Sequence, residues 1–421
     1  MRLQKYYCAL LSVLLLCTSA QGRADSAEQL FARFEPALLQ VRVLERASGA
    51  KAAIGTGFVL ENPALVVTNY HVVSDAVLAP EKFQLEYLNS SQKKGALQVL
   101  AVDVINDLAL VSTDYRAPHS FQIQPNKPVQ GATIYSLGNP HDLGMILVPG
   151  TYNGMQKYSF YPRIHFTGAV NSGMSGGPAV DANGQVVGVN VASAGNQLGF
   201  LVPADALQRL LTRYQQEGQS KDLRADIERQ LLTSQQSMFA QILQADWQLK
   251  DFGVGKIPDE VVPFVRCWGE SNVEKEQDVL KKITAFCSQS EEIFLSQHFT
   301  SGRVEMQFEW LEGKDLHPLQ FFSLYEQNIV RANADNQAQK EDVTAFECQH
   351  EVVQQAGGQH AKTIYCVRAY RAYAGLYDVL YLSASLDHQQ QGLISHYTLS
   401  GVSRETAQAF SQKFSGAVSW Q

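Results

Sequence analysis

Short apolar runs that end in Gly, Pro or Asn dominate the chain from about residue 28 to residue 202. Runs of this kind are typical of β-strands, and a long succession of them indicates a β-barrel or β-sandwich. Within this part of the chain, a helical repeat is expected only in the opening segment, 27–44. The expected strands are 54–60, 64–68, 83–87, 98–103, 108–112, 133–137, 164–167, 178–180, 186–191 and 199–202.

The pattern changes after Pro203. Apolar residues then recur at spacings of three and four over 205–216 and 223–247, which predicts two amphipathic helices. Strands return in the remainder of the chain, so we predict an α+β domain there. Its expected elements are strands 305–310, 321–324, 363–368, 377–385 and 394–401 and helices 273–286 and 404–414.

The first 24 residues have the order of a secretory signal peptide. Arg2 and Lys5 precede an almost unbroken apolar run from Cys8 to Cys17, and small residues follow up to Ala24. The run is too short to cross ~30 Å of hydrocarbon comfortably, although an uncleaved anchor is the alternative reading. We therefore expect a periplasmic or secreted protein without a stable membrane span after cleavage. The predicted boundaries are signal peptide 1–24, β domain 25–207, helical linker 208–255 and C-terminal domain 256–421.

The charge balance argues against nucleic acid as a partner. The chain has 34 Lys and Arg against 41 Asp and Glu, and no run of adjacent basic residues is longer than two. Loss of the signal peptide changes the formal net charge from -7 to -10. An acidic chain without a basic stripe lacks the electrostatic footprint that binds phosphates.

All four cysteines that remain after cleavage lie in the C-terminal domain. They are Cys267, Cys287, Cys348 and Cys366. No Cys-x-x-Cys pair occurs among them, so no zinc site is expected. In an exported protein they indicate two disulfides, with three connectivities open. Pairing of sequence neighbours would close loops of roughly 20 residues, worth ~3 kcal/mol each in the chain-entropy model.

One glycine-rich segment and two strand ends carry candidate chemistry. Asn171–Pro178 surrounds Ser175 with three glycines, which allow a chain to present a hydroxyl beside bare N–H donors. A serine hydroxyl needs an imidazole base, and that base needs a carboxylate. His71 ends one apolar run and Asp107 opens another, so the order is His, Asp, Ser. An α/β-hydrolase would have the order Ser, acid, His.

These segments resemble the trypsin-like (chymotrypsin-fold) serine proteases, and within them the Deg/HtrA type. The resemblance covers about 28–207 and implies an all-β pair of six-stranded barrels with the catalytic site between them. It rests on six ordered motifs, at 55–59, 68–73, 106–111, 137–140, 173–178 and 198–205.

The resemblance also implies the role of each site residue. Ser175 is the expected nucleophile, His71 the general base and then acid, and Asp107 the carboxylate that orients it. The N–H groups of Gly173 and Ser175, with Met174 between them, are the expected oxyanion hole. The rival acid Asp103 and the rival bases His141 and His165 lack the matching sequence context.

Substrate preference follows from the same resemblance. Ala169 is the expected floor of the primary pocket, and its walls are expected from Val170, Gly188, Val189 and Asn190. No carboxylate lies there to hold Lys or Arg, so small or medium apolar side chains are expected. Met174 stands where digestive members have an Asp, so activation by cleavage of a zymogen is not expected.

The sequence therefore predicts an exported serine endopeptidase that acts on proteins or peptides without a metal or an organic cofactor. A catalytically silent pseudo-protease that acts as a binding or adaptor module is the alternative, and hydrolysis of esters is a third reading. No PDZ-like Gly-Leu-Gly-Phe loop follows Pro203. An inhibitory or localising module, a substrate-capture surface and a structural appendage all stay open for the C-terminal domain, and the oligomeric state is also open.

Overall fold

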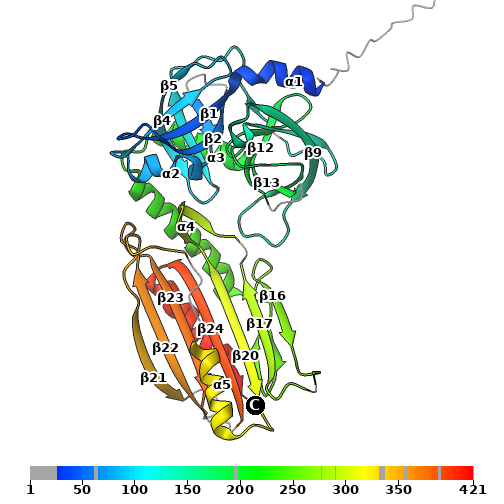
Figure 1. Cartoon of the computed structure of the whole chain (residues 1–421), viewed down its shortest axis with the longest axis vertical. Coiled ribbons are helices and arrows are strands. Elements are labelled where there is room, and N and C mark those ends of the chain that lie inside the picture. Colours follow the sequence, from blue (N-terminus) through cyan, green and yellow to red (C-terminus); the bar gives the residue numbers. More distant parts are fainter. Residues whose placement is uncertain are drawn as a thin grey trace, which may run out of the picture.

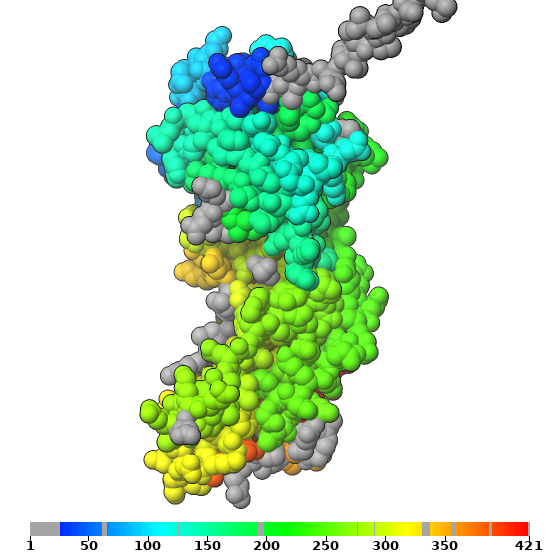
Figure 2. Space-filling view, turned by 90° about the vertical axis from the view of Figure 1, so that its right-hand side faces the viewer, coloured from blue at the N-terminus to red at the C-terminus, as the bar shows by residue number. Residues whose placement is uncertain are grey.

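The computed structural model describes residues 26–60, 65–124, 126–193, 198–275, 277–289, 291–330, 337–354, 359–386 and 390–420. The predicted signal peptide lies outside the described residues. Two lobes are stacked along the long axis of the molecule, with the barrels in one and a large sheet in the other (Figure 1). Figure 2 shows the same stacking from the side. We call residues 249–420 the C-terminal region.

Six antiparallel strands form the first barrel, in the order β1-β2-β3-β6-β5-β4. Pairing of β1 with β4 closes it. A helix, α2 (Tyr70–Leu78), follows β3. The strands are β1 (Leu38–Glu45), β2 (Lys51–Val59), β3 (Leu65–Thr68), β4 (Phe83–Leu88), β5 (Lys94–Asp103) and β6 (Leu108–Thr113).

Six further strands close into a second barrel, in the order β11-β8-β9-β10-β13-β12, through pairing of β11 with β12. A short strand, β7, adds to β12 in parallel. The predicted double six-stranded barrel is therefore confirmed. The strands are β7 (Gln122–Ile123), β8 (Thr133–Gly138), β9 (Ile146–Met155), β10 (Ile164–Thr167), β11 (Pro178–Val180), β12 (Gln185–Ser193) and β13 (Leu198–Pro203), and the 3-10 turn η2 (Pro140–Asp142) follows β8.

The opening helix is shorter than predicted. Helix α1 (Ala27–Phe34) ends before a 3-10 turn, η1 (Glu35–Ala37), that contains Pro36, and β1 begins directly afterwards. Proline has no N–H to continue a helix, and the β-branched residues that follow favour a strand. The helical prediction for residues 38–44 is therefore wrong, and α2 was not foreseen.

Two helices lead out of the barrels. They are α3 (Ala204–Glu217) and α4 (Leu223–Gln244), where two amphipathic helices were predicted. Asp222 caps α4 by accepting from the N–H groups of Arg224 and Ala225. Helix α4 crosses from the barrels into the other lobe (Figure 1) and contacts both β5 and β24.

The C-terminal region is built on a seven-stranded antiparallel sheet in the order β16-β17-β20-β24-β23-β22-β21. Helix α5 covers one face through Phe321 and Tyr325, and α6 covers the other through Phe410 and Phe414. The elements are β16 (Arg266–Ser271), β17 (Lys281–Ser288), β20 (Val304–Glu312), α5 (Pro318–Val330), β21 (Glu347–Gln354), β22 (His360–Ala369), β23 (Tyr377–Ser385), β24 (Gln391–Val402) and α6 (Arg404–Ala417).

Smaller sheets complete this region. One is the three-stranded β14-β15-β25 and the other is the β18–β19 hairpin. Their bounds are β14 (Leu249–Phe252), β15 (Gly255–Pro258), β25 (Ser419–Trp420), β18 (Ile293–Ser296) and β19 (Phe299–Ser301). The α+β character predicted for this part of the chain is confirmed. None of the helices in the described residues is long and apolar enough to span a membrane.

Two predicted elements of the C-terminal region are wrong. The predicted helix 273–286 is wrong, because residues 281–288 form strand β17, which pairs with β20 along its whole length and with β16 over residues 283–288. The predicted strand 321–324 is part of helix α5, which starts at Pro318 and buries Phe321 and Tyr325 on one face. A spacing of four residues places both rings on the same side of a helix.

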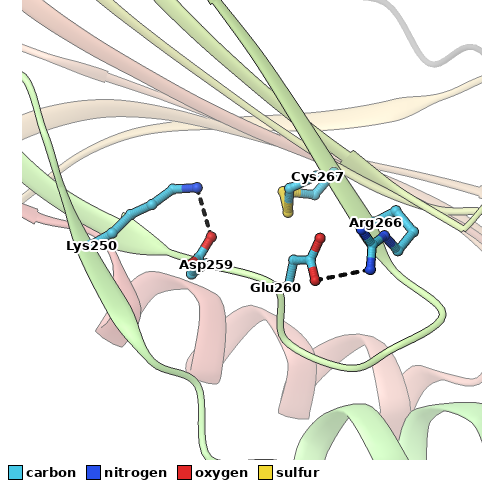
Figure 3. The surroundings of a disulfide bond; sticks show 6 residues. Lys250, Asp259, Glu260, Arg266 and Cys267 are labelled. Atoms are coloured by element: carbon cyan, nitrogen blue, oxygen red, sulfur yellow. Dashed lines mark hydrogen bonds and ion pairs between the residues drawn. A yellow bond between two sulfur atoms is a disulfide. The ribbon is translucent and has the colours of Figure 1, made fainter. Parts of the chain in front are cut away.

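Each disulfide joins two cysteines that follow one another in the order of the four. Cys267 lies directly opposite Cys287 in the β16–β17 pair, and Cys348 lies opposite Cys366 in the β21–β22 pair. Each disulfide therefore ties one edge strand of the large sheet to its neighbour. Two ion pairs, between Lys250 and Asp259 at 2.7 Å and between Arg266 and Glu260 at 3.3 Å, lie around Cys267 (Figure 3).

A single cluster of buried apolar side chains runs through both lobes. It includes Val67 of the first barrel, Ile227 of α4 and Phe308 of the large sheet. The loop between β9 and β10 also enters the interface, where Phe160 lies 5.1 Å from Phe264 between ring centroids. The C-terminal region therefore shares a continuous apolar cluster with the barrels.

Candidate active site

His71 and Asp107 are joined by two hydrogen bonds. Asp107 Oδ2 lies 2.6 Å from His71 Nδ1, and Asp107 Oδ1 accepts from the backbone N–H of His71 at 2.8 Å. Asp107 has a left-handed backbone, with φ of 60°, at the turn into β6, and His71 lies in the first turn of α2. Because Nδ1 faces the carboxylate, Nε2 is the ring nitrogen left for a substrate-side proton.

The environment of His71 acts on its pKa in two directions. Burial lowers the pKa of His71, whereas the charge of Asp107 and its hydrogen bond to the ring raise it. The net result is a pKa above the ordinary value for histidine. A carboxylate that stabilises the imidazolium makes the neutral ring a stronger base.

Asn69 is a positioning residue that was not predicted from the sequence. It begins α2, yet its amide does not cap the helix. Instead, Asn69 Nδ2 donates to the backbone carbonyl of Asp107 at 2.7 Å, and the Asn69 side chain is buried. The bond holds the Asp107 turn against the start of the helix that carries His71. An Asn at a helix start is an ordinary capping signal, so sequence alone would assign it the wrong partner.

Ser175 lies beside the segment that carries His71. Its carbonyl accepts from the N–H of Thr56 at 2.8 Å. A Cβ added to the next residue, Gly176, would lie only 2.8 Å from the backbone N of Asn69. Within the described residues, no hydrogen bond joins the Ser175 hydroxyl to His71. Catalytic hydrogen bonds of this kind are often long in structures without substrate.

The carbonyl groups of the loop 171–175 all accept hydrogen bonds. The carbonyl of Ser172 accepts from His141 N at 2.9 Å, and that of Met174 accepts from Gly177 N at 3.0 Å. A trans peptide places its N–H opposite its carbonyl, so these bonds also orient the N–H groups of Gly173 and Ser175. Neither of these two N–H groups has an acceptor within the described residues.

Met174 differs from its two neighbours in this loop. Its N–H donates to the carbonyl of Asn171 at 3.0 Å, so it is already engaged. Of the three residues predicted for the oxyanion hole, only Gly173 and Ser175 present available donors. Gly173 has φ of +92°, and a Cβ there would collide with the carbonyl of Asn139. Glycine is therefore required at this position.

Thr56 holds the Gly173 carbonyl in place and was not predicted as a site residue. Its hydroxyl donates to the Gly173 carbonyl at 2.7 Å and accepts from the N–H of Asn139 at 3.0 Å. Thr56 has no exposed surface. Its place in the Gly55-Thr56-Gly57 motif was visible in the sequence, but its partner lies 117 residues away.

The predicted specificity residues are mostly buried. Ala169 is half-buried, whereas Val170, Gly188, Val189 and Asn190 are buried. The amide of Asn190 donates to the carbonyl of Leu137 at 3.0 Å and accepts from Ser136 Oγ at 2.8 Å. Asn190 therefore supports the second barrel and the Ser175 loop from inside, and its side chain has no surface left for a substrate.

The alternative acid, Asp103, and the alternative bases, His141 and His165, have other surroundings. Asp103 accepts from the N–H and the side-chain amide of Asn106, at 3.0 and 2.8 Å. His141 is exposed and has a left-handed backbone, and the ring of His165 lies 6.4 Å from that of Phe200. In the part of the chain that the structure describes, no group of three or more His, Cys, Asp or Glu side chains is arranged to hold a metal ion.

Parts of the chain are similar to known proteins. The family model of the trypsin-like peptidase domain matches residues 55–189. A probable periplasmic serine endoprotease, DegP-like, from Chlamydia trachomatis is 30% identical over 190 residues, which are 42% of this chain and 37% of that protein. The mitochondrial serine protease HTRA2 of Bos taurus is 26% identical over 268 residues, 58% of this chain and 56% of that protein.

Among solved structures, the serine endoprotease from Yersinia pestis aligns with a TM-score of 0.40 at 23% identity, over 46% of this chain and 68% of that one. The matches span about two fifths to three fifths of the length of the curated relatives. Residues 55–189 thus match the trypsin-like peptidase domain, and the curated relatives that resemble this part of the chain include serine proteases named DegP-like and HTRA2.

Proposed function

We propose that this protein is an exported serine endopeptidase that cleaves peptide bonds through an acyl-enzyme. Ser175 is the nucleophile, His71 is the general base and then acid, and Asp107 orients His71. The observation that carries the proposal is the His71–Asp107 pair, at 2.6 Å, next to a loop with two N–H donors that lack an acceptor in the described residues. The domain match over residues 55–189 supports the same reaction.

In each step of the proposed reaction, His71 accepts or donates one proton. His71 Nε2 takes the proton of the Ser175 hydroxyl as the oxygen attacks the peptide carbonyl carbon. The N–H groups of Gly173 and Ser175 stabilise the negative oxygen that forms, an effect worth about 3 to 4 kcal/mol for each donor in comparable sites. His71 then gives its proton to the leaving amine, and water releases the acyl group by the same route.

Labelling with a fluorophosphonate probe tests this assignment. Wild-type protein with its disulfides intact should be labelled, and Ser175→Ala should not. The wild type should also cleave fluorescein-labelled casein, and the variant should not. Wild-type protein that is neither labelled nor able to cleave casein would favour the pseudo-protease reading.

The cellular location and substrate preference are part of the same proposal. The signal-like order of the first 24 residues and the periplasmic relative from Chlamydia trachomatis both support export. Mass spectrometry of the mature protein should find an N-terminus near Asp25. A peptide library should show cleavage after small or medium apolar residues, and frequent cleavage after Lys or Arg would contradict the role given to Ala169.

A further inference from the structure

We propose that Phe294, from the C-terminal region, is a positioning residue for His71, an inference that rests on the proposed proteolytic function. The β18–β19 hairpin packs against α2. The ring centroid of Phe294 lies 5.9 Å from that of His71 at an interplanar angle of 72°, and 6.3 Å from that of Tyr70 at 69°. Both contacts are edge-to-face, an arrangement that aromatic pairs prefer. The C-terminal region thus reaches the imidazole itself.

The hairpin is anchored by contacts that do not involve His71. Ile293 and Leu295 are buried, and the Tyr70 hydroxyl donates to the carbonyl of Leu295 at 2.9 Å. Phe299, on the second strand, lies 4.8 Å from Tyr370 between ring centroids. Successive strand residues point to opposite faces, so Phe294 projects away from the side on which its two neighbours are buried. The half-buried Phe294 ring is therefore held in place beside the imidazole.

His71 has few other restraints on its ring. Asp107 holds only Nδ1, because Nε2 must stay available for proton transfer, and 28% of the side chain is exposed. Rotation of the ring would carry Nε2 away from Ser175. Phe294 occupies the space beside the ring and keeps water from that side. The energy typical of such an aromatic pair corresponds to a factor of about 2 to 12 in the population of the held orientation.

The same contact could instead belong to a lid that keeps substrate away from His71. The geometry favours positioning, because the bond between His71 Nδ1 and Asp107 is intact at 2.6 Å while Phe294 touches the ring. Removal of the Phe294 ring should lower the rate at which Ser175 reacts if Phe294 positions His71, and should raise that rate if Phe294 is part of a lid. This difference makes the two roles separable by experiment.

The test uses the full-length, oxidised protein and three variants: Phe294→Ala, Phe294→Leu and Phe299→Ala. Phosphonylation of Ser175 by a fluorophosphonate probe is followed to obtain the maximal rate and the half-saturating concentration. Phe294→Ala should lower the maximal rate about 2- to 12-fold and leave the half-saturating concentration within about twofold. Phe294→Leu should recover part of the rate. Phe299→Ala removes a more deeply buried ring from the same hairpin, so it should lower Tm yet keep the wild-type rate.

An unchanged or faster rate in Phe294→Ala would overturn the inference, and so would an equal loss in Phe299→Ala. A second readout does not depend on activity. The Nδ1 proton between His71 and Asp107 should give a far-downfield NMR signal, which Phe294→Ala should broaden by exchange with water and Phe299→Ala should not. If wild-type protein fails to label, the proposed function fails, and this signal still decides the positioning role: no broadening in Phe294→Ala would refute it.

Discussion

Replacing Thr56 with valine tests how the Ser175 loop is held. The substitution keeps the shape of the side chain and removes one hydroxyl, which donates to the Gly173 carbonyl at 2.7 Å and accepts from Asn139 N at 3.0 Å. Thr56 is fully buried, so water cannot replace either bond. An unsatisfied buried polar group costs about 1 to 3 kcal/mol, and two are created here. We expect the free energy of unfolding to fall by about 2 to 6 kcal/mol.

Catalysis should fall as well, for a separate reason. The Gly173 carbonyl that Thr56 holds lies in the peptide between Gly173 and Met174, directly after the N–H of Gly173 that is proposed as an oxyanion-hole donor. Without the Thr56 hydroxyl this peptide can shift and tilt the Gly173 N–H, and full loss of one such donor, which lowers the rate by about 10²- to 10³-fold in comparable sites, is the largest effect expected. The assay is the rate of fluorophosphonate labelling, measured at a temperature where circular dichroism shows the variant folded. Thr56→Ser keeps the hydroxyl and is the matched control. A folded Thr56→Val that labels at the wild-type rate would refute the positioning argument.

Three further predictions follow from the site and the disulfides. The neutral imidazole is the base and the pKa of His71 is raised, so Ser175 labelling should fall as the pH drops through a midpoint above the ordinary histidine value near 6.5. In Asp107→Asn the NMR titration midpoint of His71 should move to lower pH, and an unchanged midpoint would contradict the pairing of His71 with Asp107. Ala169→Asp should add cleavage after Lys or Arg in a peptide library, and an unchanged profile would remove Ala169 from the pocket. Reduction of both disulfides, which close loops of 20 and 18 residues, should cost about 3 kcal/mol for each, seen as a lower Tm, while Ser175 labelling at 25 °C persists.

Most of the barrel strands could be predicted because their signals are local, whereas β1 was assigned to a helix and β9 was not predicted. Strands such as β4, β10 and β13 begin and end within a residue of the predicted bounds, since alternating apolar residues and turn residues act over a few positions. The same local reasoning failed for β17, whose apolar residues also suit a helix. Pairing with β16 and β20, and the disulfide between Cys267 and Cys287, decide that it is a strand. Helix α5 starts at Pro318, a residue that suits the first turn of a helix, whereas the short apolar run at Phe321 predicted a strand.

The residues of the candidate site also fall into those that the sequence could predict and those that it could not. His71, Asp107 and Ser175 could be proposed from the sequence because each lies in a short motif whose residue types suit one reaction. Asn69 and Thr56 could not, because their partners lie 38 and 117 residues away and their own types suggest ordinary capping or strand roles. Asn190 shows the opposite case. Its side chain was predicted to face the substrate, but it is buried and faces the interior of the barrel.

The sequence by itself determined most strands of the barrels and the residue types that suit acyl transfer, because both depend on neighbours a few positions apart. Only the tertiary structure decided what the C-terminal region touches. The bond from Tyr70 to Leu295 joins residues 225 positions apart, and Phe294 meets His71 across the same interface. Burial of apolar surface between the two lobes creates these contacts, and no local pattern in either segment encodes them.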